Sequence, residues 1–201
     1  MRNERLVVLV EIALAIALAA TLNMPGLRFK LPINIAGGTI ALNMLPIFVL
    51  AIRRGWGPGI VAGFLYGFVD LLFDPYFVHP AQVVLDYPLA YALVGLGGLL
   101  AAPWHRARAK DSPILASVLL TTGLLVGCGS RLFSHWLSGI IFFGEYAPAG
   151  QPVWLYSLIY NSSYILPSAL MAAAAAAVVL PVLERAVPVR DGRGLAWRPS
   201  S

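Results

Sequence analysis

The residues best suited to chemistry in this chain are a few polar side chains that interrupt long apolar stretches. The first group lies in residues 79–87, where Pro80 suits the first turn of a helix. Gln82 and Asp86 follow four residues apart, which predicts that they share one helix face, and Tyr87 adjoins them. Because an ionisable group is costly in an apolar helix, Asp86 indicates either a binding site or a hydrogen bond between helices.

A second group combines a cation, an imidazole and flat rings. Arg131 and His135 are four residues apart, so they share a helix face. Aromatic residues that could form a flat-ring pocket follow them: Trp136, Phe142, Phe143 and Tyr146. A lone helical histidine often only packs, and Arg131 could instead partner a carbonyl or a carboxylate, so a structural role stays open for both.

A third group lies near the start of the last apolar stretch and consists of Trp154, Tyr156, Tyr160, Asn161 and Tyr164. Trp and Tyr are typical of the membrane interface, and we expect Trp154 and Tyr164 to lie in such an aromatic belt. Asn161 differs, since an inward-facing amide can form hydrogen bonds with a polar heterocycle.

These groups do not form a familiar enzymatic pattern. The sequence contains no phosphate-binding glycine loop, no zinc-ligand spacing and no serine nucleophile elbow. A carboxylate beside aromatic rings favours binding of a cationic ring over bond cleavage. An intramembrane hydrolase, in which Asp86 and His135 activate water, is the less favoured alternative. The single cysteine, Cys128, cannot form a disulfide within the chain, and an apolar surrounding favours a packing role.

The composition indicates that apolar membrane helices position these groups. Of 201 residues, 59% are hydrophobic and only 11% are charged, too few to cover a soluble globule. The hydrophobic stretches predict an all-α integral membrane protein with six transmembrane helices, at residues 5–24, 36–53, 56–73, 80–101, 112–142 and 153–184. Basic residues are spread over the ends of these helices and form no stripe with aromatic residues, so we expect no nucleic-acid partner.

The distribution of basic residues predicts the topology. If both termini are cytoplasmic, that side carries Arg2, Arg5, Arg53, Arg54, Arg106, Arg108, Lys110, Arg185, Arg190, Arg193 and Arg198. The other side then carries only Arg28 and Lys30, in agreement with the positive-inside rule and with six crossings. We therefore expect a membrane domain at 1–186 and a flexible cytoplasmic tail at 187–201.

Several motifs resemble those of the thiamine-specific S components of energy-coupling-factor (ECF) vitamin importers. They are Asp74-Pro75-Tyr76 with the stretch 79–87, His135-Trp136-Leu137-Ser138-Gly139 continuing to Pro148, Tyr156-Ser157-Leu158-Ile159-Tyr160-Asn161, and Arg53-Arg54-Gly55. Together they cover nearly the whole chain. The resemblance implies the six-helix S-component fold in the plasma membrane of a prokaryote.

The resemblance also implies a function without catalysis or a bound cofactor. Such a subunit captures thiamine at the outer face and delivers it while docked to an ECF transmembrane subunit and two ATPase subunits. Carried over by position, the ligand-binding residues are Tyr66, Tyr76, Asp86, Tyr87, His135, Phe143, Tyr156 and Asn161. Asp86 could offset the thiazolium charge or accept from the aminopyrimidine, while His135, Tyr156 and Asn161 could bond ring nitrogens.

Three departures from the family pattern bear on this site. Asp86 stands where the family often has Glu, and Phe143 where it often has Trp, so both reach and stacking area are smaller. Residues 25–38 also lack a tryptophan that the family carries in this loop. Trp136 or Trp154 could compensate for the smaller aromatic surface.

The first helix offers a surface for a partner. Ala13 and Ala17 belong to a stripe of small residues that permits close helix packing, and in the resembling family a similar stripe docks the transmembrane subunit. Packing within the chain is the alternative. For the function, the alternatives are an S component for another flat vitamin or precursor, such as riboflavin or a pyrimidine, and a self-sufficient secondary transporter. The last would be expected to show inverted repeats, which the sequence does not display.

Overall fold

A computed structural model describes residues 4–30, 38–73 and 75–189. Its helices are α1 (Glu4–Leu22), α2 (Met44–Arg54), α3 (Trp56–Asp70), α4 (Pro80–Asp86), α5 (Pro88–Val94), η1 (Gly95–Leu100), α6 (Ala101–Ala109), α7 (Pro113–Phe142), η2 (Gly144–Tyr146) and α8 (Val153–Ala186). Two short strands, β1 (Phe29–Lys30) and β2 (Thr39–Ile40), pair antiparallel. With α4 to α6 taken as one interrupted segment, the described chain has six helical passes, which confirms the predicted all-α membrane fold.

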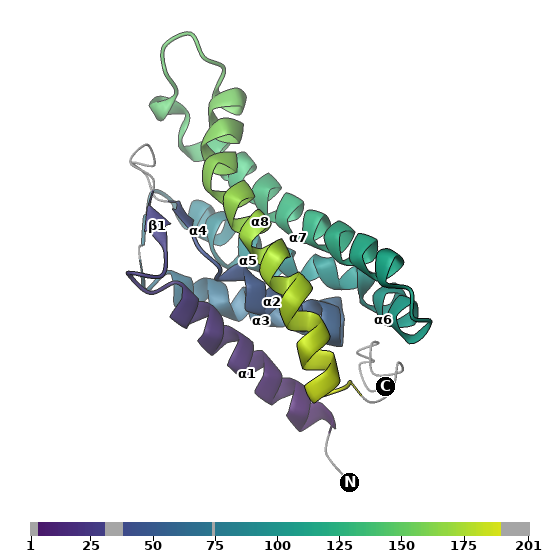
Figure 1. Cartoon of the computed structure of the whole chain (residues 1–201). Helices are drawn as coiled ribbons and strands as arrows, with labels where there is room; N and C mark the ends of the chain where they lie inside the picture. Colours follow the sequence, from purple (N-terminus) through teal and green to yellow (C-terminus); the bar gives the residue numbers. More distant parts are fainter. Residues whose placement is uncertain (1–3, 31–37, 74, 190–201) are drawn as a thin grey trace, which may run out of the picture.

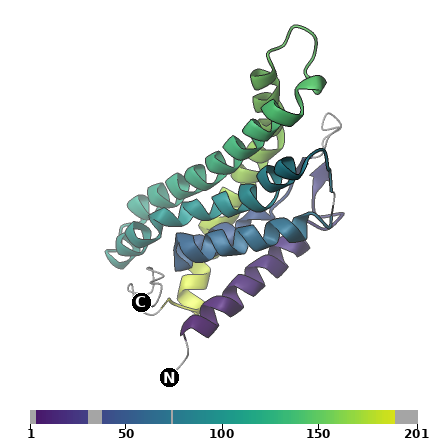
Figure 2. The same cartoon turned by 180° about the vertical axis from the view of Figure 1, so that it is seen from behind.

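The helices form one bundle in which α2 occupies the centre. Every residue of α2 is buried, whereas α1, α7 and α8 keep many exposed apolar side chains. Figures 1 and 2 show α1 and α3 side by side at one edge and α7 at the other, while α8 starts beside α7 and crosses the bundle toward the end where α1 begins. The α7–α8 connection projects beyond the bundle. This distribution suits a bundle whose outer helices face lipid.

The second and third helices are shorter than predicted. Four helical stretches of the described chain are long and apolar enough to cross a membrane: α1, residues 80–109, α7 and α8. α2 has 11 residues and α3 has 15, which correspond to lengths of about 16 and 22 Å. The predicted helix at 36–53 was too long because Thr39 and Ile40 pair with β1 and the helix begins only at Met44.

The predicted helix at 80–101 is interrupted at Tyr87. Pro88 has no amide hydrogen and cannot continue the helical hydrogen bonding, so α4 ends at Asp86 and α5 starts at Pro88. The helix then tightens into η1, which contains three glycines, before α6 extends the segment to Ala109, beyond the predicted end. The interruption leaves Asp86 and Tyr87 at a bend instead of within a regular turn.

Close contact between α3 and α5 requires glycine. A side chain at Gly63 would collide with the backbone of Tyr91, and one at Gly67 would collide with that of Pro88. The two glycines are four residues apart, so they present one smooth face of α3 to α5. This packing fixes the end of α3, where Asp70 lies, against the start of α5.

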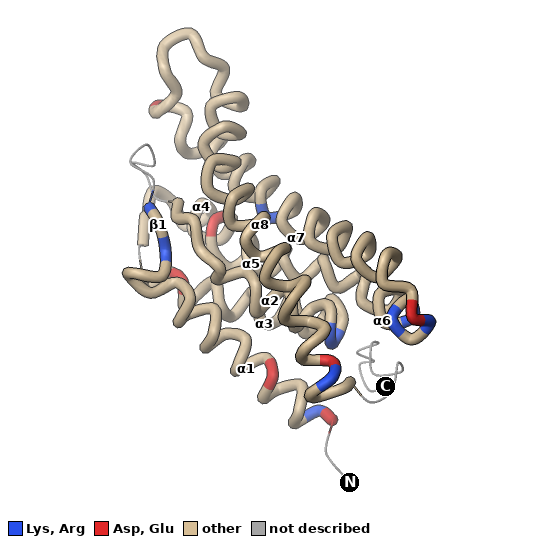
Figure 3. Tube along the Cα trace, in the orientation of Figure 1, with Lys and Arg blue, Asp and Glu red and all other residues tan. Residues whose placement is uncertain are grey.

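Charged residues gather at the ends of the bundle (Figure 3). One end carries the start of α1 and the ends of α6 and α8, and we call it the basic end. There Arg53 of α2 pairs with Glu184 of α8 at 2.6 Å, and Arg54 forms a two-pronged ion pair with Glu11 of α1. Both arginines are buried, so these ion pairs connect three helices.

Candidate ligand-binding site

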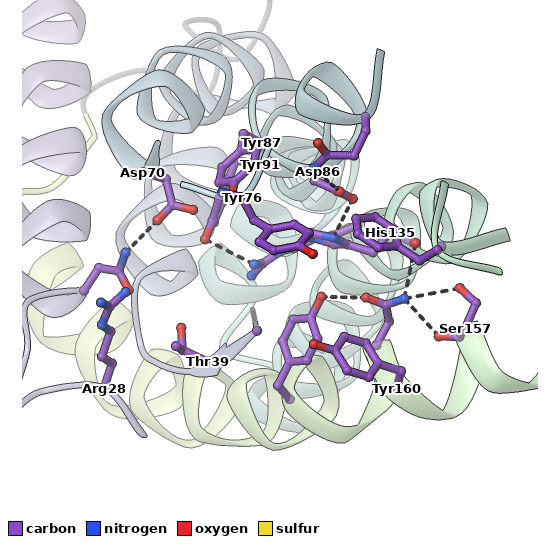
Figure 4. Close-up of a pocket in the computed structure, with 18 of the residues that line it drawn as sticks. Arg28, Thr39, Asp70, Tyr76, Asp86, Tyr87, Tyr91, His135, Ser157 and Tyr160 are labelled. Carbon is purple, nitrogen blue, oxygen red and sulfur yellow. Dashed lines mark hydrogen bonds and ion pairs between the residues drawn. The ribbon is translucent and has the colours of Figure 1, made fainter. Parts of the chain in front are cut away.

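The opposite end of the bundle contains a pocket of about 110 Å³. Helix ends, β2 and the turn after α1 contribute to its wall, and α7 and α8 form one side. The lining residues are Asn23, Arg28, Gly38, Thr39, Asp70, Tyr76, Gln82, Asp86, Tyr87, Tyr91, Arg131, His135, Gly139, Phe143, Tyr156, Ser157, Tyr160, Asn161 and Tyr164. Figure 4 shows Asp70, Arg28 and Thr39 at one side of this pocket and Asp86, His135 and Ser157 at the other.

Asp86 is held in place by three polar neighbours. Its carboxylate accepts hydrogen bonds from Gln82 Nε2 at 2.7 Å and from Ser138 Oγ at 2.9 Å, and it lies 3.1 Å from His135 Nδ1. Gln82 also accepts from the Val78 backbone at 3.2 Å, which fixes the amide in turn. The sequence prediction that Gln82 and Asp86 share a face is confirmed, and the arrangement orients a carboxylate toward the pocket.

His135 has one nitrogen committed and one available. Nδ1 faces Asp86, whereas Nε2 is buried and has no hydrogen-bond partner among the described residues. A buried ring nitrogen without a partner is costly, and a ligand hydrogen bond would remove that cost. The Asp86 carboxylate also selects the tautomer with hydrogen on Nδ1 when the ring is neutral, which leaves Nε2 as an acceptor.

Asn161 is already engaged by the protein. Its Nδ2 donates to the backbone oxygens of Ser157 at 2.9 Å and His135 at 3.2 Å, and its Oδ1 accepts from Tyr164 Oη at 2.6 Å. The amide therefore ties α8 to α7 beside His135. Its oxygen keeps a second lone pair that a ligand could use.

Aromatic rings cover the pocket on the side of the α7–α8 connection. Tyr76 and Phe143 lie 5.9 Å apart between ring centroids, with their planes tilted by 32°. Tyr76 Oη is 2.8 Å from Tyr146 Oη, and its backbone amide donates to Tyr87 Oη at 3.0 Å. The hydrogen bond to Tyr76 raises the pKa of the exposed Tyr146 hydroxyl. Tyr156 and Tyr160 add two further rings from α8, 5.8 Å apart.

A polar network that joins Arg131 and Tyr66 to Asn23, Asp70 and Tyr91, which were not predicted as site residues, forms and supports another wall. Asp70 accepts from Asn23 Nδ2 at 2.6 Å and from Tyr66 Oη at 3.0 Å. Arg131 donates to Tyr91 Oη at 3.1 Å, and its guanidinium carbon lies 4.3 Å from the Tyr91 ring centroid. Two carboxylates, at Asp70 and Asp86, thus face two guanidinium groups, at Arg28 and Arg131, around one pocket.

Asn43 joins the two parts of that network. Its Nδ2 donates to Tyr91 Oη at 2.7 Å and lies 3.2 Å from Tyr66 Oη. Asn23 Oδ1 and Arg131 Nε are buried without a hydrogen-bond partner in the described part of the chain. The wall therefore offers an unused hydrogen-bond donor at Arg131 Nε and unused acceptors at Asn23 Oδ1 and His135 Nε2.

Seven of the eight predicted ligand-binding residues line the pocket, and Tyr66 does not. Tyr66 is fully buried behind the wall, where it supports Asp70, because it lies one helical turn before that residue on α3. Tyr164 was expected at the membrane interface but is buried and lines the pocket. Trp154 is exposed, and its backbone oxygen accepts from Trp136 at 2.9 Å. Asp74 lies outside the described residues.

Fold and pocket together define a multi-pass membrane protein with a polar pocket lined by aromatic rings. The family model described as "Thiamine transporter protein (Thia_YuaJ)" matches residues 9–188. The chain therefore belongs to the thiamine transporter family, and it is a transport protein and not an enzyme.

Individual relatives agree with this assignment over nearly the whole chain. The thiamine transporter ThiT of Bacillus subtilis (strain 168) is 34% identical over 189 residues, which cover 93% of this chain and 95% of that protein. ThiT of Lacticaseibacillus paracasei is 34% identical over 203 residues, covering 98% of each. A solved structure of ThiT from Listeria monocytogenes superimposes with a TM-score of 0.81 at 27% identity, covering 91% of this chain and 98% of that one.

Proposed function

We propose that this chain is the thiamine-binding S component of an ECF-type importer, and that Asp86 and His135 form the centre of its binding site. The observation that carries the proposal is Asp86 in contact with His135 Nδ1, while the buried Nε2 of that ring has no partner in the described chain. Thiamine has a cationic thiazolium ring and a flat aminopyrimidine with ring nitrogens. The pocket complements both parts, since it combines a carboxylate with hydrogen-bonding groups and aromatic faces.

The roles of the other residues follow from their places in the wall. Tyr76, Tyr87, Phe143 and Tyr156 supply aromatic surface, and Asn161 supplies an oriented amide oxygen. The negative charge of Asp70 offsets the positive charge of Arg131, so that the carboxylate of Asp86 remains available to a cationic ligand. Without this second carboxylate the guanidinium groups would oppose binding of a cation.

The pocket would open to the outside if the basic end is cytoplasmic, as the positive-inside rule favours. The chain would then capture thiamine at the outer face of a prokaryotic plasma membrane. ATP hydrolysis would belong to partner subunits, and capture itself would need no cofactor.

Binding by the isolated chain tests the proposal. Purified chain in detergent should bind thiamine without ATP, with heat evolved in calorimetry and a rise in thermal stability. Riboflavin, biotin and a neutral pyrimidine serve as controls. Binding of riboflavin or biotin without binding of thiamine would overturn the substrate assignment while leaving the fold intact.

Docking to a transmembrane partner would use α1. Ala13 and Ala17 are exposed on the side of α1 that faces away from the bundle, whereas Ile12, Ala15 and Ala19 are buried. This exposure supports a partner surface in preference to packing within the chain.

Ala13→Trp or Ala17→Trp should therefore abolish uptake in cells that contain the partner subunits, because a bulky ring holds two helices apart. Thiamine binding by the isolated variant should stay unchanged. If thiamine binding is lost while the variant still assembles with the partner subunits, the stripe serves internal packing instead.

A further inference from the structure

A second cavity lies near the basic end, far from the ligand pocket along the bundle. It measures about 210 Å³ and is bounded by α2, α6, α7 and α8. In Figure 1, α7 and α8 run side by side near their connection and diverge toward the end where α6 finishes, and residues of both helices line the cavity. Pro181, which lines the cavity, also removes the amide hydrogen that would otherwise donate to the Ala177 carbonyl.

The cavity is apolar at depth and polar near the turn between α6 and α7. Its deep wall contains Phe48, Leu124 and Ala173, whereas Arg108, Ser117 and Thr121 line it nearer the turn. From Pro113 at the turn to Leu124 the distance along α7 is about 16 Å, comparable to a large part of an acyl chain. This gradient from a polar end to an apolar end matches the gradient within one phospholipid.

Arg108 places a cation at the polar end. Its guanidinium carbon lies 5.4 Å from the Trp104 ring centroid, and Trp104 is almost fully buried, so the side chain rests against the cavity wall. The ion pairs found in the described residues engage Arg53 and Arg54 but not Arg108. A guanidinium that lines a cavity and forms no ion pair with the described carboxylates suits a phosphate, which it can bind through two parallel hydrogen bonds.

We propose that this cavity is a binding site for one anionic phospholipid. The phosphate lies beside Arg108, the hydroxyl groups of Ser117 and Thr121 contact the glycerol ester region, and one acyl chain fills the space between α7 and α8. The occupant is a lipid because α7, α8 and the segment 80–109, which border the cavity, are long and apolar enough to cross a membrane, and the deep wall offers apolar contacts. The charge of Arg108 selects an anionic headgroup over a zwitterionic one.

Native mass spectrometry tests the proposal on the full chain. Purified protein is mixed with equal amounts of phosphatidylglycerol and phosphatidylcholine that carry the same acyl chains. We expect the wild-type chain to retain phosphatidylglycerol preferentially. Arg108→Gln should reduce retained phosphatidylglycerol about tenfold, the lower end of the effect expected for a charged hydrogen bond.

Arg106→Gln is the matched control, since Arg106 is exposed on the same helix, does not line the cavity and gives the same change in net charge. It should retain phosphatidylglycerol as the wild-type chain does. Equal loss in both variants, or no loss in either, would overturn the site. Equal binding of glycerol 3-phosphate, which has no acyl chain, would also contradict a lipid site.

A second pair of variants tests the acyl part without a change of charge. Ala177→Trp should fill the space between the helices and lower the amount of retained phosphatidylglycerol. Ala174→Trp should not, because Ala174 is equally exposed on the same helix but does not line the cavity. Size-exclusion profiles and melting temperatures report whether each variant folds. If Arg108→Gln does not fold, this pair decides the outcome, and equal retention by both variants contradicts the proposal.

Discussion

The two ends of the bundle use buried charge in opposite ways. At the basic end, Arg53 and Arg54 are matched by Glu184 and Glu11, and these ion pairs join α1, α2 and α8. At the pocket end, Asp86 lies 3.1 Å from His135 Nδ1, but His135 Nε2 keeps no partner among the described residues. Complete pairing indicates a role in stability, whereas a buried charged group with an unused neighbour indicates a site prepared for a ligand.

Breaking an ion pair at the basic end should have the largest effect on stability and little effect on binding. Glu11→Gln keeps the side-chain shape but leaves the buried Arg54 without its main counter-charge. We expect the free energy of unfolding to fall by about 3 kcal/mol, the lower end for one partner of a buried pair. Chemical or thermal unfolding in detergent measures the change.

Glu4 provides the control for this variant. Glu4 lies 3.8 Å from Arg54 and its side chain is 64% exposed, so Glu4→Gln should change stability little. Thiamine affinity should stay at the wild-type level in both variants. A large loss of thiamine affinity in folded Glu11→Gln would contradict the assignment of stability to the basic end and of ligand binding to the pocket end.

Asp70→Asn sharpens the comparison at the pocket end. The substitution keeps hydrogen-bonding capacity toward Asn23 and Tyr66 but removes the negative charge of Asp70 that acts on Arg131. Thiamine affinity should fall about tenfold, equivalent to about 1.4 kcal/mol, since an uncompensated cation opposes a cationic ligand. Calorimetric titration measures the change.

Tyr66→Phe separates charge from hydrogen bonding at this position. It removes one donor to Asp70 without altering the charge, so its effect on affinity should be smaller. Equal affinities of Asp70→Asn and the wild-type chain would assign Asp70 to helix packing.

Ser138→Ala should have the smallest effect of these changes. Ser138 is fully buried and donates one of the hydrogen bonds that orient Asp86, while Gln82 and His135 continue to hold the carboxylate. We expect about a threefold loss of thiamine affinity, or about 0.7 kcal/mol. An unchanged dissociation constant would show that the remaining neighbours suffice to position Asp86.

The sequence predicted the side of the pocket that depends on regular helical spacing. Gln82 with Asp86 and Arg131 with His135 are one turn apart, and each pair contributes to the pocket wall. Whether the predicted residues contact thiamine remains a prediction. Tyr66 does not line the pocket, since the family position was carried over without a way to decide which side of α3 faces the cavity.

The other side of the pocket could not be predicted by spacing. Asn23, Thr39 and Asp70 come from a turn, a strand and a helix end, and only the tertiary packing of α3 and the β ribbon brings them to one cavity. One signal was available: Asp70 is an ionisable residue in an apolar stretch, the same feature that singled out Asp86. The bend at Tyr87 was also readable from Pro88.

Titration of Asp86→Asn with thiamine tests the central claim most directly. The variant preserves the shape of the side chain but removes the negative charge that would offset the thiazolium ring. Affinity should fall by about 10- to 150-fold, corresponding to about 1.5–3 kcal/mol for a charge-assisted interaction. A neutral pyrimidine fragment should lose less than thiamine if the carboxylate mainly serves the thiazolium. If the folded variant binds thiamine as tightly as the wild-type chain, Asp86 is a helix-packing residue and the proposed site is wrong.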